Sequence, residues 1–247
     1  MSNNNKIALY GFNNLTKSLS FSLYRVHYIH DELAKSVYQQ MINKRYSSEM
    51  LSLLLSDICH AIGGNILNIA SQNYQPHGAS VTLMISEEAQ PESLVAHLDK
   101  SHLCIHTYPD DNPQHGIAIF RADIELSTCG IISPVKVINY IIEEFDADVV
   151  DIDYRVRGMT RDKSGKKLFS DENVFSLNDF ISETIKENYN IKNNQLSHCN
   201  LFHSRLARKK ITLDNAIFLY EKTDLPSELT QLTNINLKQQ VKDIFNS

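Results

Sequence analysis

The stretch HLCIHTYPDDNPQHGIAIFRADIEL, residues 102–126, indicates the kind of sheet this chain forms. Apolar and polar side chains alternate along residues 102–108 and again along much of residues 116–126, a pattern typical of strands with one buried face. The segment between them, PDDNPQHG, is rich in turn-forming residues, which predicts two strands joined by a loop. Polar side chains are unusually dense here, because Ser101 precedes the first strand and two histidines lie within it.

Helices are expected before and after this strand pair in the sequence. Residues 31–45 begin acidic and end basic, and residues 47–62 carry an apolar stripe that stops at a Gly-Gly pair. A third helix is expected over residues 133–145, with Ser133 as N-cap and Pro134 in its first position. Further strands are expected at residues 65–74, 79–86 and 147–158, and beyond about residue 160 the chain becomes polar and more helical.

These elements predict one α+β domain over residues 1–247. We expect a two-layer sandwich in which helices cover a mainly antiparallel sheet, with a helical C-terminal extension. Three C-terminal segments are expected to pack on that sheet: residues 176–190, 198–210 and 227–245.

The composition of the chain argues against some kinds of binding partner. The 247 residues include 24 Lys and Arg against 29 Asp and Glu, a net charge of −5, and no long basic run, which argues against nucleic acid as a partner. No segment approaches the roughly 18 apolar residues of a membrane helix, and the N-terminus has no signal-peptide pattern. We therefore expect a soluble, cytoplasmic protein that does not bind membranes.

Cysteine and histidine spacing gives no metal motif. The four cysteines match no zinc pattern and, without an export signal, are expected to be reduced and mostly buried. His102 and His106 would lie on one face of a strand, where they could share a metal, but no third ligand is evident and two polar residues on a partly wet face are favoured. Ser101 lacks the G-x-S-x-G context of a hydrolase nucleophile.

Two other segments could carry chemistry. Cys129 lies in the loop sequence ELSTCG just before the expected third helix, where positive potential suits a thiol that donates a proton or acts as a nucleophile. Ser80 lies at the start of a strand, directly after the turn sequence QPHGA. Taken separately, both signals are weak.

Taken together, the segments PHGAS, KSHLCIHTYPD, FRADIELSTCG and DIDYRVRGMTRD strongly resemble the S-adenosylmethionine decarboxylase proenzymes, in their longer enterobacterial-type form. The resemblance is specific from about residue 75 to 163 and looser through the N-terminal helices and residues 200–206. It implies a self-cleaving decarboxylase whose product is the aminopropyl donor for spermidine.

The resemblance also implies how the chain is processed. The bond between Lys100 and Ser101 is cut after Ser101 Oγ attacks the Lys100 carbonyl and converts the amide to an ester. A base then removes the Cα proton of residue 101, and elimination followed by hydrolysis leaves a pyruvoyl group on residues 101–247 and makes residues 1–100 a separate chain. His106 takes the place of the processing base, which suits an imidazole, and Ser80 that of a hydrogen-bonding support.

In this family the pyruvoyl ketone forms a Schiff base with the substrate amine and accepts the electrons left by decarboxylation. Cys129 then matches the proton donor to the substrate carbon. Tyr108 matches an aromatic position suited to the adenine or the sulfonium, and Asp110 an acidic position, commonly Glu, that binds the ribose. The shorter Asp110 leaves the ribose contact open, and the neighbouring Asp111 could substitute.

One geometric difficulty follows from strand periodicity. Ser101 and His106 are five positions apart, so a regular strand points them to opposite faces, and a bend or a frayed strand start is expected to bring them together.

Several alternatives stay open from the sequence. The same fold and pyruvoyl group could decarboxylate arginine or ornithine, or the chain could be a non-catalytic paralogue that activates a partner, although Ser101, His106 and Cys129 are all retained. The resemblance further implies a homo-oligomer of processed pairs and the use of magnesium as an activator.

Overall fold

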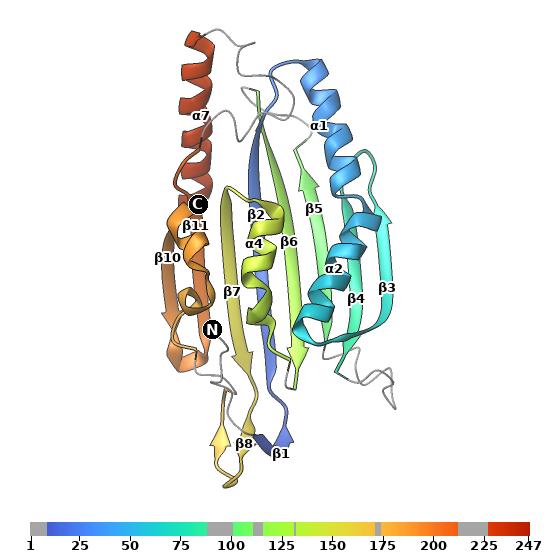
Figure 1. Ribbon diagram of the computed structural model, residues 1–247, viewed down its shortest axis with the longest axis vertical. Helices are drawn as coiled ribbons and strands as arrows, with labels where there is room; N and C mark the ends of the chain where they lie inside the picture. The colour runs from blue at the N-terminus through green and yellow to red at the C-terminus, as the bar shows by residue number, and fades with distance from the viewer. Residues whose placement is uncertain (1–8, 88–100, 111–115, 131, 171–173, 212–226) are drawn as a thin grey trace.

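The computed structural model describes residues 9–87, 101–110, 116–130, 132–170, 174–211 and 227–247 (Figure 1). In chain order its elements are β1 (Leu9–Asn13), β2 (Thr16–Tyr28), α1 (Glu32–Arg45), α2 (Ser48–Ile62), β3 (Asn65–Asn73), β4 (Ala79–Ser86), β5 (His102–Pro109), β6 (Ile117–Cys129), η1 (Pro134–Val137), α4 (Ile138–Phe145), β7 (Val149–Arg157), β8 (Thr160–Asp162), β9 (Lys167–Leu168), η2 (Leu177–Phe180), α5 (Glu183–Asn188), β10 (Tyr189–Leu196), η3 (Ser197–Cys199), β11 (Leu201–Arg208) and α7 (Ser227–Asn246).

An eight-stranded sheet forms the centre of the molecule, with strand order β10-β11-β7-β2-β6-β5-β4-β3. Every neighbouring pair in it is antiparallel. The long strand β2 lies between β7 and β6, so it connects the two halves of the sheet. A small sheet of order β1-β8-β9 extends beyond one end.

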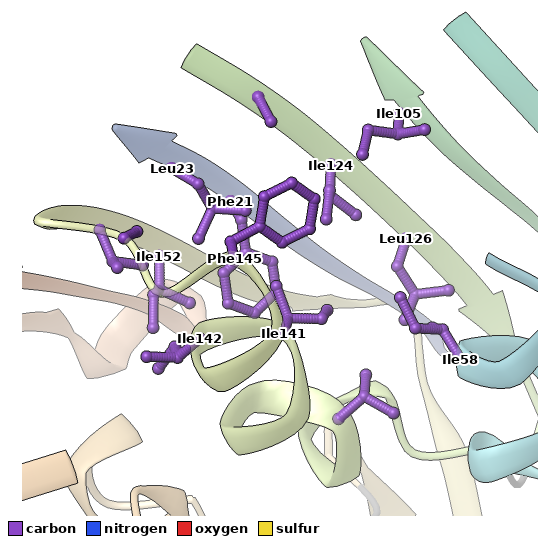
Figure 2. Close-up of a cluster of buried hydrophobic side chains, with 14 of the residues drawn as sticks. Phe21, Leu23, Ile58, Ile105, Ile124, Leu126, Ile141, Ile142, Phe145 and Ile152 are labelled. Atoms are coloured by element: carbon purple, nitrogen blue, oxygen red, sulfur yellow. The ribbon is translucent and has the colours of Figure 1, made fainter. Parts of the chain in front are cut away.

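Helices α1, α2 and α4 cover one face of the large sheet (Figure 1). The core between the layers forms because alternate residues of the central strands β2, β4, β5, β6 and β7 are mostly apolar and point toward these helices. Figure 2 shows how side chains from α2 and α4 meet those of the strands: Phe21, Leu23, Ile58, Ile105, Ile124, Leu126, Ile141, Ile142, Phe145 and Ile152.

Local sequence sets the ends of the first two helices. Asp31 caps α1 by accepting a hydrogen bond from Ala34 N at 2.7 Å, and Ser47 caps α2 by accepting one from Met50 N at 3.3 Å. Gly63 ends α2 in the left-handed conformation, with φ 88°. Both predicted helices are therefore confirmed, with their first predicted residues acting as caps.

The other face of the sheet is polar over most of its area. Side chains that point away from α2 and α4 include Ser20 and Ser22 of β2, His106 of β5, and Asp123 and Glu125 of β6, and all are at least partly exposed. Helix α7 covers only one end of this face, where Leu237 and Val241 pack among apolar residues of β2, β6, β7 and β11: Val26, Tyr28, Ile117, Val149 and Ala207.

The predicted fold class is confirmed, since helices cover a mainly antiparallel sheet and α7 follows as a C-terminal helix. Two local predictions are corrected. The helix expected over residues 133–145 begins as the 3-10 turn η1, and Ser133 makes no side-chain cap hydrogen bond. Part of the region expected to be more helical forms the strands β10 and β11, which extend the sheet. None of the described helices is both long and apolar enough to span a membrane.

Candidate active site

Ser101 lies directly before β5, and only 1% of its surface is exposed. Its carbonyl oxygen accepts a hydrogen bond from Ile85 N at 3.3 Å, which continues the pairing of β5 with β4. The side chain is therefore held at the start of a strand in the middle of a sheet. This is a rigid position for a hydroxyl group.

Cys129 is the residue that contacts the Ser101 side chain. Its Sγ lies 3.3 Å from Ser101 Oγ, and its backbone N–H donates a hydrogen bond to the same oxygen, also at 3.3 Å. The contact follows from strand register, because His102 pairs with Ser127 and Cys129 ends β6 two residues later. The structure thus brings together two of the residues that the sequence singled out.

Ser80 and His106 form a second pair. They face each other directly across β4 and β5, and both are half-buried on the polar face of the sheet. His106 also lies opposite Asp123 of β6, whose carboxylate accepts a hydrogen bond from Ser22 at 2.9 Å and pairs with Arg121 at 3.0 Å. A row of polar groups therefore runs across four strands at this level.

The two pairs do not meet within one chain. Ser101 and His106 are five positions apart along an extended strand, a distance of about 16 Å at ~3.3 Å per residue. Ser101 does lie at the strand start, as the sequence analysis allowed, but β5 then runs as regular strand from His102 to Pro109 and no bend shortens the distance. His106 is therefore out of reach of Ser101 in the same chain.

Tyr108 and Asp110 lie farther still from Ser101. Tyr108 is 46% exposed, about 23 Å along the strand at ~3.3 Å per residue, and the Arg121 guanidinium lies 4.4 Å from its ring centre. Asp110 is half-buried, and its backbone N–H donates to Ile119 O at 3.0 Å. Lys100 and Asp111 fall outside the described residues.

A metal shared by His102 and His106 does not fit this geometry. Four positions along a strand separate the two imidazoles by about 13 Å, whereas metal–nitrogen bonds are about 2 Å long. Among the residues that the structure describes, no three His, Cys, Asp or Glu side chains are grouped to hold an ion. The magnesium activation that the resemblance implies stays a prediction.

The four cysteines have different environments, and all are free thiols. Cys59 is buried, and burial raises its pKa to about 11. Cys104 is half-buried, and burial together with the nearby Glu125 raises its pKa. Cys199 is exposed, so the expectation of mostly buried thiols holds fully for Cys59 alone. Only Cys129 contacts another sequence-predicted site residue among those the structure describes.

Two charged residues beside Cys129 were missed from the sequence. The ammonium group of Lys17 donates to Gly130 O at 2.9 Å, and the carboxylate of Glu87 accepts from Ile132 N at 3.3 Å. A usable signal existed for Lys17, because it occupies the apolar phase of the alternating segment TKSLSFSLYRVHY. Glu87 has no comparable signal, since it lies just beyond a strand end.

Comparison with known proteins shows which family the chain resembles in sequence. The family model described as S-adenosylmethionine decarboxylase matches residues 37–158. The S-adenosylmethionine decarboxylase proenzyme of Marinobacter nauticus is 43% identical over 98% of this chain and 97% of its own length. The protein of the same name from Clostridium acetobutylicum is 43% identical over 98% of this chain and 94% of its own length.

The chain belongs to the S-adenosylmethionine decarboxylase family. This confirms the resemblance inferred from the sequence and makes the chain a member of a family of decarboxylases. Among solved structures, the adenosylmethionine decarboxylase from Aquifex aeolicus is 21% identical, with a TM-score of 0.36 and coverage of 59% of this chain and 91% of that chain. The assignment rests on the sequence relatives, whose matches span nearly the whole chain.

Proposed function

We propose that this chain is a proenzyme that cuts itself before Ser101, carries the resulting pyruvoyl group, and decarboxylates S-adenosylmethionine to the aminopropyl donor for spermidine. The observation that supports it best is the contact between Ser101 and Cys129, 28 positions apart in the sequence. A buried hydroxyl and a thiol in contact supply a cofactor precursor and a proton donor at one point.

The surroundings of Ser101 fit the first processing step. The Cys129 N–H donates to Ser101 Oγ, which fixes the oxygen while leaving lone-pair density for attack on the carbonyl of residue 100. The hydroxyl proton can point to Cys129 Sγ, since either atom can be the donor in that contact. Attack converts the amide to an ester, and removal of the Cα proton of residue 101 then releases the ester carboxylate.

The pyruvoyl group, when formed, supplies a ketone that condenses with the substrate amine and accepts the electrons freed by loss of carbon dioxide. Cys129 Sγ lies close to where the ketone forms, because Sγ contacts Oγ of Ser101, the residue that becomes the pyruvoyl group. A thiol there can return a proton to the substrate carbon. The near-complete burial of Ser101 limits competition from water.

His106, Ser80, Tyr108 and Asp110 are proposed to act on a second copy of the chain. His106, Tyr108 and Asp110 lie about 16 Å or more from Ser101 in the direction of β5, and Ser80 of β4 lies opposite His106. If two copies pair through the polar face of the sheet with strands in opposite directions, the Ser101 end of one copy lies over the His106 end of the other. The proposed homo-oligomer then completes two identical sites, each from both copies.

Complementation tests this arrangement directly. Ser101→Ala has no nucleophile and His106→Ala lacks the processing base, so each alone is expected to stay uncut. When the two are co-expressed with different tags, a shared site contains the Ser101 of one and the His106 of the other, so the His106→Ala chain is cut. If that chain stays whole in purified mixed oligomers, the site does not span two copies.

The function itself is tested by mass and by product. Denatured protein is expected to separate into residues 1–100 and a blocked fragment of residues 101–247. Folded protein is expected to release carbon dioxide from S-adenosylmethionine. Ser101→Ala is expected to remain one chain of 247 residues without activity. A fully active protein that stays intact would contradict the proposal.

A further inference from the structure

Strand β2 carries a lysine where its pattern calls for an apolar residue. Leu19, Phe21 and Leu23 point toward the helices, and Lys17 has the same phase and is fully buried. Burial of an ammonium group is unfavourable unless hydrogen bonds and charge compensate it. A lysine in this position therefore indicates a local task rather than a contribution to the core.

The hydrogen bond that Lys17 makes shows which part of the site it acts on. Lys17 pairs with Thr128 across β2 and β6, and its Nζ donates to Gly130 O at 2.9 Å. Gly130 is the residue after Cys129, so the ammonium group holds the carbonyl of the residue next to the candidate proton donor. The hydrogen bond is charge-assisted and buried, which makes it stronger than a neutral one at the surface.

Glu87 holds the same loop from another side. Its Oε1 accepts a hydrogen bond from Ile132 N at 3.3 Å. Gly130 has φ 66°, and a Cβ at that position would collide with the Glu87 carboxylate. The loop after Cys129 therefore needs glycine for its backbone conformation, and a side chain at this position would also displace the Glu87 carboxylate.

Cys129 depends on this loop because its backbone makes one of the two contacts with Ser101. The N–H and the Sγ both lie 3.3 Å from Ser101 Oγ, so a rotation of the chain at residues 129–130 would move both. Displacement of a catalytic group by about 1 Å can cost on the order of a hundredfold in rate.

We propose that Lys17, together with Glu87, is a positioning residue that directs the Cys129 thiol to the substrate carbon. The inference rests on the proposed function and adds which residues determine the carbon atom that receives the proton after decarboxylation. After loss of carbon dioxide, a proton from Cys129 Sγ forms the new C–H bond of the product and leaves a thiolate. A proton delivered instead to the carbon of the protein-bound group lets water release the substrate as an aldehyde, while its amino group stays on the protein as an N-terminal alanine. That chain is inactive.

The test measures inactivation per turnover, which a general loss of stability would not change. Processed protein is incubated with S-adenosylmethionine, product is counted, and N-terminal sequencing measures alanine on a fragment that is otherwise blocked. Lys17→Met keeps the aliphatic stem without the donor, and Lys136→Met, at an exposed position of η1, is the matched control. We expect Lys17→Met to raise alanine formed per product by about tenfold or more, equivalent to about 1.4 kcal/mol in the partition, and Lys136→Met to match the unaltered protein.

Two further variants separate the possible failures. Gly130→Ala displaces the same loop without touching the core and is expected to raise the ratio as well, which keeps the test open if Lys17→Met does not fold. Cys129→Ala should give the highest ratio. If Cys129→Ala behaves as the unaltered protein, the proposed role of Cys129 fails. If Cys129→Ala raises the ratio of alanine to product while folded Lys17→Met and Gly130→Ala leave it unchanged, only the positioning role fails. Slower cutting by Lys17→Met is also expected, because the loop carries the Cys129 N–H that contacts Ser101 Oγ. If Lys17→Met is not cut at all, the ratio measured in Gly130→Ala decides.

Discussion

Replacement of Thr107 by valine tests how the sheet holds Ser80 opposite His106. Thr107 is 2% exposed, and its Oγ1 accepts a hydrogen bond from Ala79 N at 2.8 Å and donates one to Ala79 O at 3.2 Å. Ala79 is fully buried and directly precedes Ser80. Valine has nearly the same shape but no hydroxyl, so Thr107→Val leaves a buried backbone N–H unpaired. This costs about 2 kcal/mol, within the usual 1–3 kcal/mol for such a group.

The measurement uses chains that cannot cut themselves. In a Ser101→Ala background, Thr107→Val is expected to lower the free energy of unfolding by about 2 kcal/mol and the melting temperature by roughly 4–8 °C. Thr107→Ser is the matched control, because it keeps both hydrogen bonds and loses one methyl group, at about 1 kcal/mol. Thr107→Val is therefore expected to be about 1 kcal/mol less stable than Thr107→Ser.

Processing gives a second readout in chains that retain Ser101. Since Ala79 sets the backbone of Ser80, Thr107→Val is expected to cut itself more slowly than Thr107→Ser. If Thr107→Val proves as stable as Thr107→Ser and is processed at the same rate, the hydroxyl does not hold this part of β4, and the reasoning is wrong.

Three other predictions follow from the site and the surface. Cys129→Ala should still bind substrate covalently but turn over at least about a hundredfold more slowly; wild-type turnover would exclude the thiol as proton donor. Reductive trapping with cyanoborohydride should label residues 101–247 with S-adenosylmethionine but much less with arginine or ornithine, which have no adenine for Tyr108 or ribose for Asp110. If arginine or ornithine labels the fragment readily and S-adenosylmethionine does not, the proposed substrate is wrong. Asp146 is subject to burial, which raises its pKa, but bonds to Arg208 and the charge of Arg25 hold that pKa below its usual value. The stabilisation that ionised Asp146 provides is therefore present at neutral pH and lost as pH falls through the lowered pKa. Asp146→Asn is expected to lower the free energy of unfolding by about 1 kcal/mol at pH 7, after allowance for solvent screening, and not to lower it in strong acid. An equal loss at both pH values would contradict this.

Local pattern was enough for the elements whose signals are local. The alternation in residues 102–108 and 116–126 gave β5 and β6, and capping residues gave α1 and α2 to within a residue. Strand β2 was not predicted, although Leu19, Phe21 and Leu23 alternate with serines along it. Its central place in the sheet depends on pairing with strands about a hundred positions away, which no local pattern reveals.

The candidate site shows the same division. Resemblance picked out Ser101, Cys129, Ser80 and His106, but only the register of β4, β5 and β6 shows which of them touch. The role of Lys17 depends on a hydrogen bond across 113 positions of sequence, so a lysine in an apolar phase was the most that the sequence could offer. The burial of Lys17 arises only when the sheet has folded, and this burial is what points to a function for its charge.

The place of β2 determines what becomes of the chain after a cut before Ser101. Residues 1–100 would contribute β2, which lies between β6 and β7 of the downstream fragment, while β4 of the first fragment pairs with β5 of the second. The two fragments would be interleaved, so neither could leave without opening ladders on both sides of β2. Separation would then be as slow as global unfolding, yet once apart the fragments would meet only as independent molecules. Such a protein would persist as long as it stayed folded, but unlike the uncut chain it would refold at a rate that falls with dilution.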